Sequence, residues 1–236
     1  MSDQECQIEI PRRGALYVDG FNLYHPIHET GMNHLKWSCL WKLGEMLCNP
    51  EGLKLVKVVF CTAVPDHLPG SFERHLMYNN AISSRGVKIL RGHHVPADGS
   101  YTEKQSDINV ALSVICDGED DEYDAAFLLS ADSDQVATAK FFNSRLAPKG
   151  KMLFAAIPPG QNCPTHYKGL GVPRRNISIA MIERCVMDAQ VQGANGLITR
   201  PSEYDPPAEW VHPNNRPKTK VPKPPPKEAW SKGAKG

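Results

Sequence analysis

Aspartates follow two apolar segments of the chain, at the points where strands of a parallel sheet would end. Asp19 directly follows the apolar run at 15–18, and Asp132 and Asp134 follow the run at 125–129. A further acid, Asp107, lies at the start of an amphipathic segment. Because ligands of an open parallel α/β sheet bind beyond the C-terminal ends of its strands, we expect these four acids to meet at one edge of the sheet.

Four carboxylates at one edge would repel one another unless a cation or raised pKa values compensated for their charge. Two carboxylates about 4 Å apart repel by several kcal/mol at an intermediate effective dielectric. Oxygen ligands with no nearby cysteine are typical of Mg²⁺ or Mn²⁺ sites, and such ions can promote phosphodiester hydrolysis. The pattern therefore favours a metal-dependent hydrolase over the alternative, in which each Asp only caps a turn or helix.

Alternating strands and helices are predicted to position these acids. Runs typical of buried strands fall at 15–18, 55–63, 87–90, 125–129, 151–156 and 176–179. Apolar residues recur at helical spacing over 35–48, 71–84, 107–116 and 135–142, and a last helix runs to about 187. Parallel neighbours need such crossovers, so we predict an α/β fold with a mostly parallel central sheet covered on both faces.

The end of the chain differs in composition from the rest. Residues 200–236 hold eight Lys and Arg against four Asp and Glu, with nine of the 20 prolines, whereas residues 1–199 hold 19 basic and 22 acidic residues. We expect 200–236 to be a disordered, basic, proline-rich tail. Such a tail can attract phosphate, dock on a protein partner or act only as a solubilising linker.

Composition excludes several classes of protein. The chain has 236 residues, 41% of them hydrophobic, and no window approaches the roughly 20 apolar residues of a membrane span. The N-terminus has no apolar signal region, so we expect no membrane partner and a cytoplasmic location. The seven cysteines are odd in number and lack C-x-x-C spacing, which indicates reduced thiols rather than a disulfide framework or zinc knuckle.

Three segments resemble the NYN domain family, a branch of the PIN-like nuclease superfamily that includes the LabA/DUF88-type proteins. They are YVDGFNLYH at 17–25, EKQSD at 103–107 and YDAAFLLSADSDQ at 123–135, in the family's order and at about its spacing. The resemblance implies a PIN-like three-layer α/β/α domain over 13–190 and a metal-dependent ribonuclease activity.

The resemblance also implies which residues form the site. Its catalytic and metal-binding acids are Asp19, Asp107, Asp132 and Asp134, and its supporting polar residues are Asn22 and Ser130. One departure is Ala131, where many relatives have glycine, and a positive φ at this position would strain the alanine.

Other polar residues are candidates for contact with RNA. Lys104 lies three residues before Asp107 and could neutralise a phosphate, and His93 and His94, expected in a polar loop, could line the substrate groove. A second basic loop suits single-stranded RNA through phosphate contacts and stacking. Its basic residues are Lys168, Arg174 and Arg175. For all of these residues, an ordinary solvated surface is the competing interpretation.

The leading hypothesis is a cytoplasmic Mg²⁺- or Mn²⁺-dependent endoribonuclease acting on RNA, single-stranded by preference. The alternative is a non-catalytic RNA- or protein-binding regulatory module on the same fold. A D-x-D phosphatase is less favoured, because that motif normally follows the first strand of its domain and here it follows the fourth predicted strand. The sequence leaves open the RNA cleaved, activity on DNA, homo-oligomer formation and the role of the tail.

Overall fold

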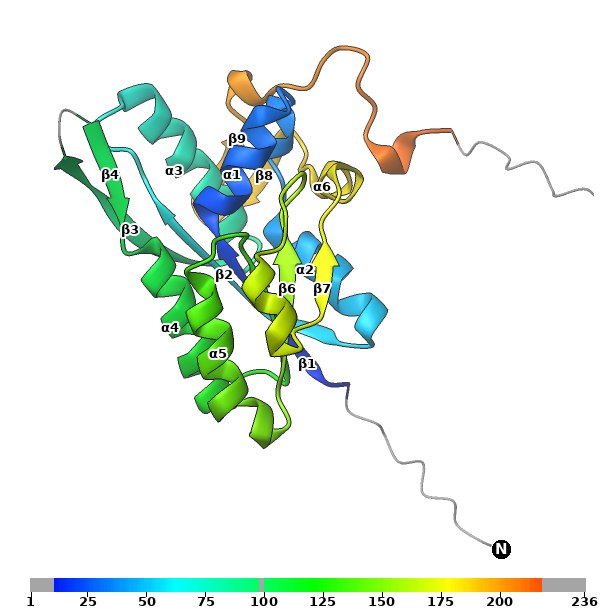
Figure 1. Cartoon of the computed structure of the whole chain (residues 1–236). Helices are drawn as coiled ribbons and strands as arrows, with labels where there is room; N and C mark the ends of the chain where they lie inside the picture. The colour runs from blue at the N-terminus through cyan, green and yellow to red at the C-terminus, as the bar shows by residue number, and fades with distance from the viewer. Residues whose placement is uncertain (1–10, 98–99, 218–236) are drawn as a thin grey trace, which may run out of the picture.

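A seven-stranded sheet forms the centre of the molecule, as can be followed in Figure 1. The computed structural model describes residues 11–97 and 100–217. The strands are β1 (Arg13–Asp19), β2 (Lys54–Ala63), β3 (Lys88–Ala97), β4 (Ser100–Lys104), β5 (Ala125–Leu129), β6 (Met152–Ile157) and β7 (Arg174–Asn176). Their order is β4-β3-β2-β1-β5-β6-β7, and every neighbouring pair is parallel except β3 and β4. The predicted mostly parallel α/β sheet is therefore confirmed.

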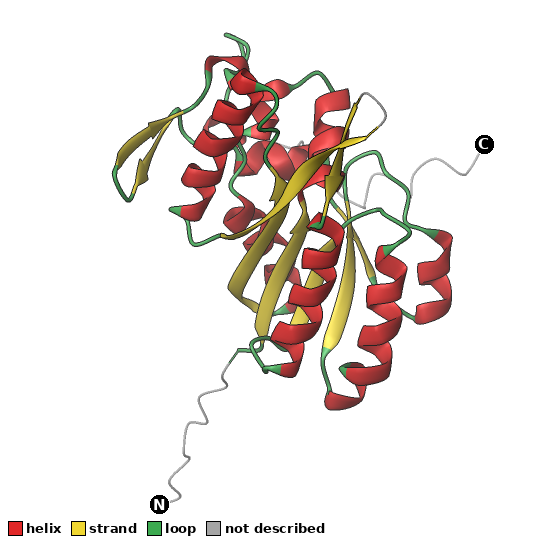
Figure 2. Ribbon diagram, turned by 90° about the vertical axis from the view of Figure 1, so that its left-hand side faces the viewer, coloured by secondary structure: helices red, strands yellow, loops and turns green. Residues whose placement is uncertain are grey.

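Helices cover both faces of this sheet (Figure 2). They are α1 (Gly20–Glu29), α2 (Leu40–Cys48), α3 (Pro69–Ser83), α4 (Ser106–Glu119), α5 (Gln135–Arg145) and α6 (Ile179–Cys185). A separate hairpin of β8 (Gln190–Gly193) and β9 (Gly196–Thr199) contacts α3. None of the helices in the described ranges is both long and apolar enough to cross a bilayer.

The alternation of side chains along β1 explains the layers. Leu16 and Val18 are fully buried against the helices α1, α2, α3 and α6, whereas Ala15 and Tyr17 are fully buried against α4 and α5. Successive strand residues point to opposite faces, so a strand covered on both sides must be apolar throughout. This is why residues 15–18 form an unbroken apolar run.

The chain changes direction across the sheet between β1 and β5. After β1 the strands β2 and β3 are added on one side, and β5, β6 and β7 are added on the other. Val18 of β1 pairs with Leu129 of β5, so the two strands end side by side. In open α/β sheets this kind of switch point is where ligands bind.

Several predicted elements differ from the observed ones. The helix predicted over 35–48 is broken into a 3₁₀ turn at Asn33–Lys36 and α2, because Ser38 bridges to Val186 and the buried Trp37 donates its indole N–H to the carbonyl of Asp188 at 2.9 Å. The helix α1 was not predicted. The last strand of the central sheet is β7, and residues predicted as strand up to 179 instead lead into α6, where the Ser178 hydroxyl accepts the backbone N–H of Met181 at 3.2 Å.

The third strand is longer than predicted, and its second half pairs with an antiparallel partner. His93 and His94 were expected in a loop, but they lie within β3 opposite Lys104 and Glu103 of β4. An antiparallel neighbour satisfies the backbone of β3 beyond the end of β2, so the strand continues outward as a two-stranded arm.

The expectation of disorder from residue 200 is wrong for residues 200–217. Tyr204 is buried, and the Trp210 ring lies 5.0 Å from that of His34. Glu183 accepts a hydrogen bond from the Trp210 indole at 3.2 Å and pairs with Arg216 at 2.8 Å. Aromatic side chains thus fix this segment to the body despite its prolines, while 218–236 lie outside the described residues.

The six cysteines in the described ranges are all free thiols. Cys48, Cys61 and Cys185 are buried in the core. Burial raises the pKa of these three thiols to about 12, so they remain protonated near neutral pH. The interpretation of the cysteines as small core residues is confirmed for these three.

Candidate functional site

Asp19 ends β1, is fully buried and caps α1 with its side chain. One carboxylate oxygen accepts the backbone N–H of Asn22 at 3.1 Å. The other accepts the Asn22 amide at 2.6 Å and the Ser130 hydroxyl at 3.1 Å. The next residue is Gly20, where a Cβ atom would lie 2.7 Å from the Cys61 carbonyl oxygen, so glycine is required for α1 to start this close to β2.

The segment that follows β5 is joined to this carboxylate through a hydrogen-bond network. The Ser130 oxygen also accepts the backbone N–H of Asp132 at 3.0 Å, and the Asn22 side-chain oxygen accepts that of Ala131 at 3.0 Å. The Asp132 carboxylate accepts the backbone N–H of Asp134 at 2.9 Å. Ala131 is not among the positive-φ residues of the described chain, so its Cβ introduces no backbone strain.

Asp107 reaches the same region from the first turn of α4. Gln105, two residues before Asp107, has a φ of 80°. This left-handed conformation costs a non-glycine residue roughly 1–2 kcal/mol. This turn directs the chain from β4 into α4. Gln135, at the start of α5, donates its side-chain amide to the Asp107 carbonyl at 3.0 Å and so links α4 to the segment after β5.

Burial and repulsion between these carboxylates contribute to raised pKa values at Asp19 and Asp107. The pKa of Asp107 rises to about 6, first because of burial and then because of nearby carboxylates. These carboxylates belong to Asp19, Asp132, Glu103 and Asp134. The pKa of Asp19 is also raised, chiefly by burial, although hydrogen bonds from Asn22 and Ser130 oppose the shift. The four predicted acids therefore share one electrostatic environment.

Glu103 belongs to this environment and was missed by sequence reasoning. Its carboxylate accepts the backbone N–H of Ser106, the first residue of α4, at 3.0 Å. A capping box has its acid within the first turn of the helix, whereas Glu103 precedes the helix, so no standard capping signal marks it in the sequence. Its charge adds to that of the predicted acids and further favours a cation nearby.

The predicted acids are more widely spaced than the ligands of a compact metal centre. Within the described residues, the one group of three His, Cys, Asp or Glu ligand atoms within 4.8 Å of one another consists of Asp66, His67 and His94. Mg²⁺ usually retains several waters and binds through one or two carboxylates, so an all-oxygen group with this spacing suits a partly hydrated ion.

Of the other residues predicted to contact RNA, Lys104 and His93 lie opposite each other in the β3–β4 pair, whereas His94 faces away from them. Lys104 is exposed at the end of β4, and His93 is exposed with one ring nitrogen 3.2 Å from the Gln105 side-chain oxygen. His94 points to the other side of β3, where its ring lies 6.2 Å from that of Phe21 in α1. Lys104, three residues before Asp107, is the predicted cation nearest in sequence to the acids.

The two arginines of the basic loop lie in β7, at the opposite edge of the sheet. Arg174 is exposed in β7, and Arg175 pairs with Glu51 at 2.5 Å and lies 4.9 Å from the centre of the Phe154 ring. Strands β5 and β6 separate β7 from β1. The side chain of Lys168 lies outside the described part of the structure. Arg175 thus has a structural role, and β7 does not bring Arg174 or Arg175 to the acids. The buried Tyr167 of the same loop does lie near one of them, because its pKa is raised chiefly by burial and in part by Asp132.

Comparison with known proteins supports the fold and no more. No model of a known protein family matches the chain, and no curated protein matches it either. A crystal structure of a protein of unknown function from Vibrio parahaemolyticus aligns with a TM-score of 0.52 at 16% identity, covering 73% of this chain and 97% of that protein. At this identity the likeness shows a shared fold alone, and membership of the NYN family stays a prediction.

Proposed function

We propose that this chain is a Mg²⁺- or Mn²⁺-dependent endoribonuclease of PIN-like fold that hydrolyses single-stranded RNA. The observation that carries the proposal is the hydrogen-bonded group of Asp19, Asn22, Ser130 and Asp132 where β1 and β5 end. A buried carboxylate that repels its acidic neighbours costs folding free energy, and such groups cluster at functional sites.

The four aspartates would hold the ion. They are Asp19, Asp107, Asp132 and Asp134. When bound, Mg²⁺ or Mn²⁺ supplies the positive charge that promotes attack by water and stabilises the leaving oxygen. The chain's own contribution is positioning, because Asn22 and Ser130 fix both oxygens of Asp19 and the turn after β5 fixes Asp132. Lys104, exposed beside this edge, is the candidate for contact with the phosphate backbone.

The experiment compares Mn²⁺-dependent cleavage of a single-stranded RNA by the full chain and its variants. Asp19→Asn and Asp132→Asn should each lower the cleavage rate by roughly 100-fold or more, because each removes a ligand charge from the ion. Asp120→Asn is the matched control, since Asp120 is an exposed acid at the other end of α4. Circular dichroism should show that all variants fold.

A non-catalytic RNA- or protein-binding module is the second candidate function. The observation that favours it is that no three of the four acids bring one carboxylate oxygen each within 4.8 Å of one another in the described structure. RNA binding that persists in EDTA, with no cleavage by wild type at any Mn²⁺ concentration, would support the module and refute the nuclease. Cleavage that survives unchanged in both aspartate variants would remove these residues from the mechanism.

A further inference from the structure

A second group of side chains with metal-binding chemistry lies beside the arm formed by β3 and β4. Asp66 and His67 come from the loop between β2 and α3, and His94 comes from β3. One ligand atom of each lies within 4.8 Å of the other two. A ring nitrogen of His67 lies 3.8 Å from the Asp66 carboxylate, too far for a hydrogen bond.

The two imidazoles each have a ring nitrogen without a partner. Nδ1 of His67 and Nδ1 of His94 are shielded from solvent and make no hydrogen bond within the described structure. Most buried polar atoms in proteins have a hydrogen-bond partner, so two orphaned nitrogens on neighbouring rings require an explanation. A bound cation would satisfy such nitrogens, because a neutral imidazole offers a lone pair to a metal.

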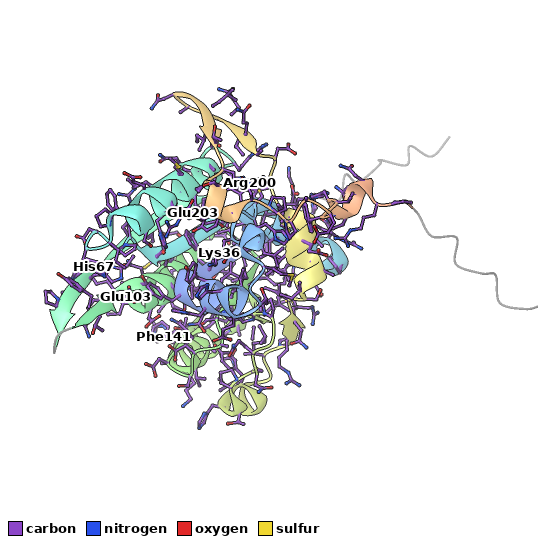
Figure 3. The ribbon with its side chains drawn as sticks, turned by 90° about the horizontal axis from the view of Figure 1, so that it is seen from above. Lys36, His67, Glu103, Phe141, Arg200 and Glu203 are labelled. Atoms are coloured by element: carbon purple, nitrogen blue, oxygen red, sulfur yellow. The ribbon has the colours of Figure 1, made fainter. Side chains whose placement is uncertain are left out.

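Aromatic neighbours hold both rings in place. The ring of Tyr101, from β4, stacks on that of His67 at 3.8 Å with an angle of 3° between their planes. The His94 ring lies 5.2 Å from that of His67, at 65°, and 6.2 Å from that of Phe21 on its other side. Figure 3 shows His67 and Glu103, the residue paired with His94, on the same side of the molecule. The rings are thus positioned before any ligand arrives.

We propose that Asp66, His67 and His94 form a binding site for a late divalent transition metal, with Zn²⁺ as the best-suited ion. Two imidazoles and one carboxylate are a typical zinc donor set that leaves a fourth position open. Nitrogen ligands favour Zn²⁺ over Mg²⁺ or Mn²⁺, which prefer oxygen. A cavity of about 190 Å³, lined in part by Phe21, His67, His94 and Tyr101, leaves room for a fourth ligand.

The site would join two parts of the fold that flank the acidic edge. The loop that carries Asp66 and His67 leads into α3, and His94 belongs to the arm that leads through β4 to α4 and Asp107. The same cavity is bordered by Gly20, the residue after Asp19. A metal here would therefore fasten the arm to the body beside the acids. This inference does not depend on ribonuclease activity.

Zinc binding to the metal-free full chain tests the site directly. We expect one Zn²⁺ per chain in competition with a chromogenic chelator, and His67→Ala and His94→Ala should each weaken this binding by at least roughly 10-fold. His93→Ala is the matched control, because His93 neighbours His94 on β3 but lies exposed beside Gln105. Asp132→Asn should retain zinc binding, which separates this site from the acids of the proposed nuclease.

Two further measurements distinguish a variant that has lost the zinc site from one that does not fold. Zn²⁺ should raise the melting temperature of wild type and of the His93 variant but not of His94→Gln, which retains a polar side chain at this position. Co²⁺ in place of Zn²⁺ should give visible absorption bands that both His67 and His94 variants lose. Absence of stoichiometric zinc in wild type, or equally tight zinc in the His67 and His94 variants, would overturn the proposal.

Discussion

Aspartates at the two ends of the central sheet have pKa values shifted in opposite directions. At the end where the strands begin, Asp124 pairs with Arg13 at 2.9 Å, and Asp121 pairs with Lys151 at 2.7 Å. Hydrogen bonds from these basic groups lower the pKa of both acids. At the end where the strands finish, burial and neighbouring carboxylates raise the pKa of Asp19 and Asp107.

This contrast separates the acids that stabilise the fold from those that reduce its stability. An acid beside a cation contributes to folding, and an acid beside other acids costs free energy unless a ligand compensates. The first group includes a third, more buried example, in which Lys57 pairs with Asp117 at 2.7 Å and Asp117 accepts the Tyr17 hydroxyl at 2.8 Å. The acids at the first end therefore stabilise the fold, and those at the other end are the ones for which we propose a function.

The largest expected effect comes from removing the cation of the buried pair. Lys57→Met should lower the free energy of unfolding by roughly 3–5 kcal/mol, because it leaves the Asp117 carboxylate buried without its positive partner. Both side chains are less than a fifth exposed. Urea denaturation measures the loss, and adding Asp117→Asn should recover part of it. A loss no greater than that of an exposed lysine variant would contradict a structural role for the pair.

A smaller loss is expected at the partly exposed pair of Arg13 and Asp124. Asp124→Asn should cost about 1 kcal/mol at pH 7, after allowance for solvent screening of a pair about one third exposed. The folded-state pKa of Asp124 is lowered, so its contribution is present above the unfolded pKa of about 3.9 and is lost as pH falls through the folded value. Chemical denaturation at several pH values should show the deficit at pH 7 shrinking in strong acid. A deficit independent of pH would argue against the ion pair.

The smallest effect should have the opposite sign, at the other end of the sheet. Asp107→Asn should stabilise the metal-free chain by about 1 kcal/mol or less at pH 8, because it removes a carboxylate that its neighbours repel. The folded-state pKa of Asp107 is raised to about 6, so stability is lost as pH rises through that value. Melting temperatures in EDTA should thus differ at pH 8 and converge near pH 4. Destabilisation at pH 8 would instead indicate that Asp107 is compensated.

The meeting of the acids could be predicted because it follows from local patterns and one rule of topology. The apolar runs before Asp19 and Ser130 mark strands, and parallel strands end at one edge. The helix α1 could not be predicted, because Pro26 interrupts its pattern and its start depends on the close contact of Gly20 with β2. The break in the predicted helix over 35–48 depends on a bridge to Val186, which no local pattern encodes.

Contacts between distant segments explain the rest of what the sequence did not predict. The grouping of His67 with His94 arises because β4 pairs back on β3 and brings Tyr101 over the His67 ring. The spacing of apolar residues does not predict which distant segments pair in this way. The cations that neutralise Asp117 and Asp124 likewise come from strands far away in the sequence.

The packing of residues 200–217 determines where the chain can be shortened. Glu183 is largely enclosed, and hydrogen bonds from Arg216 and from the Trp210 indole lower its pKa. A truncation at residue 190 would remove both hydrogen-bond donors, expose the His34 ring and leave the Glu183 carboxylate on α6 without these partners. A folding unit for expression therefore has to include the chain at least as far as Arg216, well past the last strand of the central sheet.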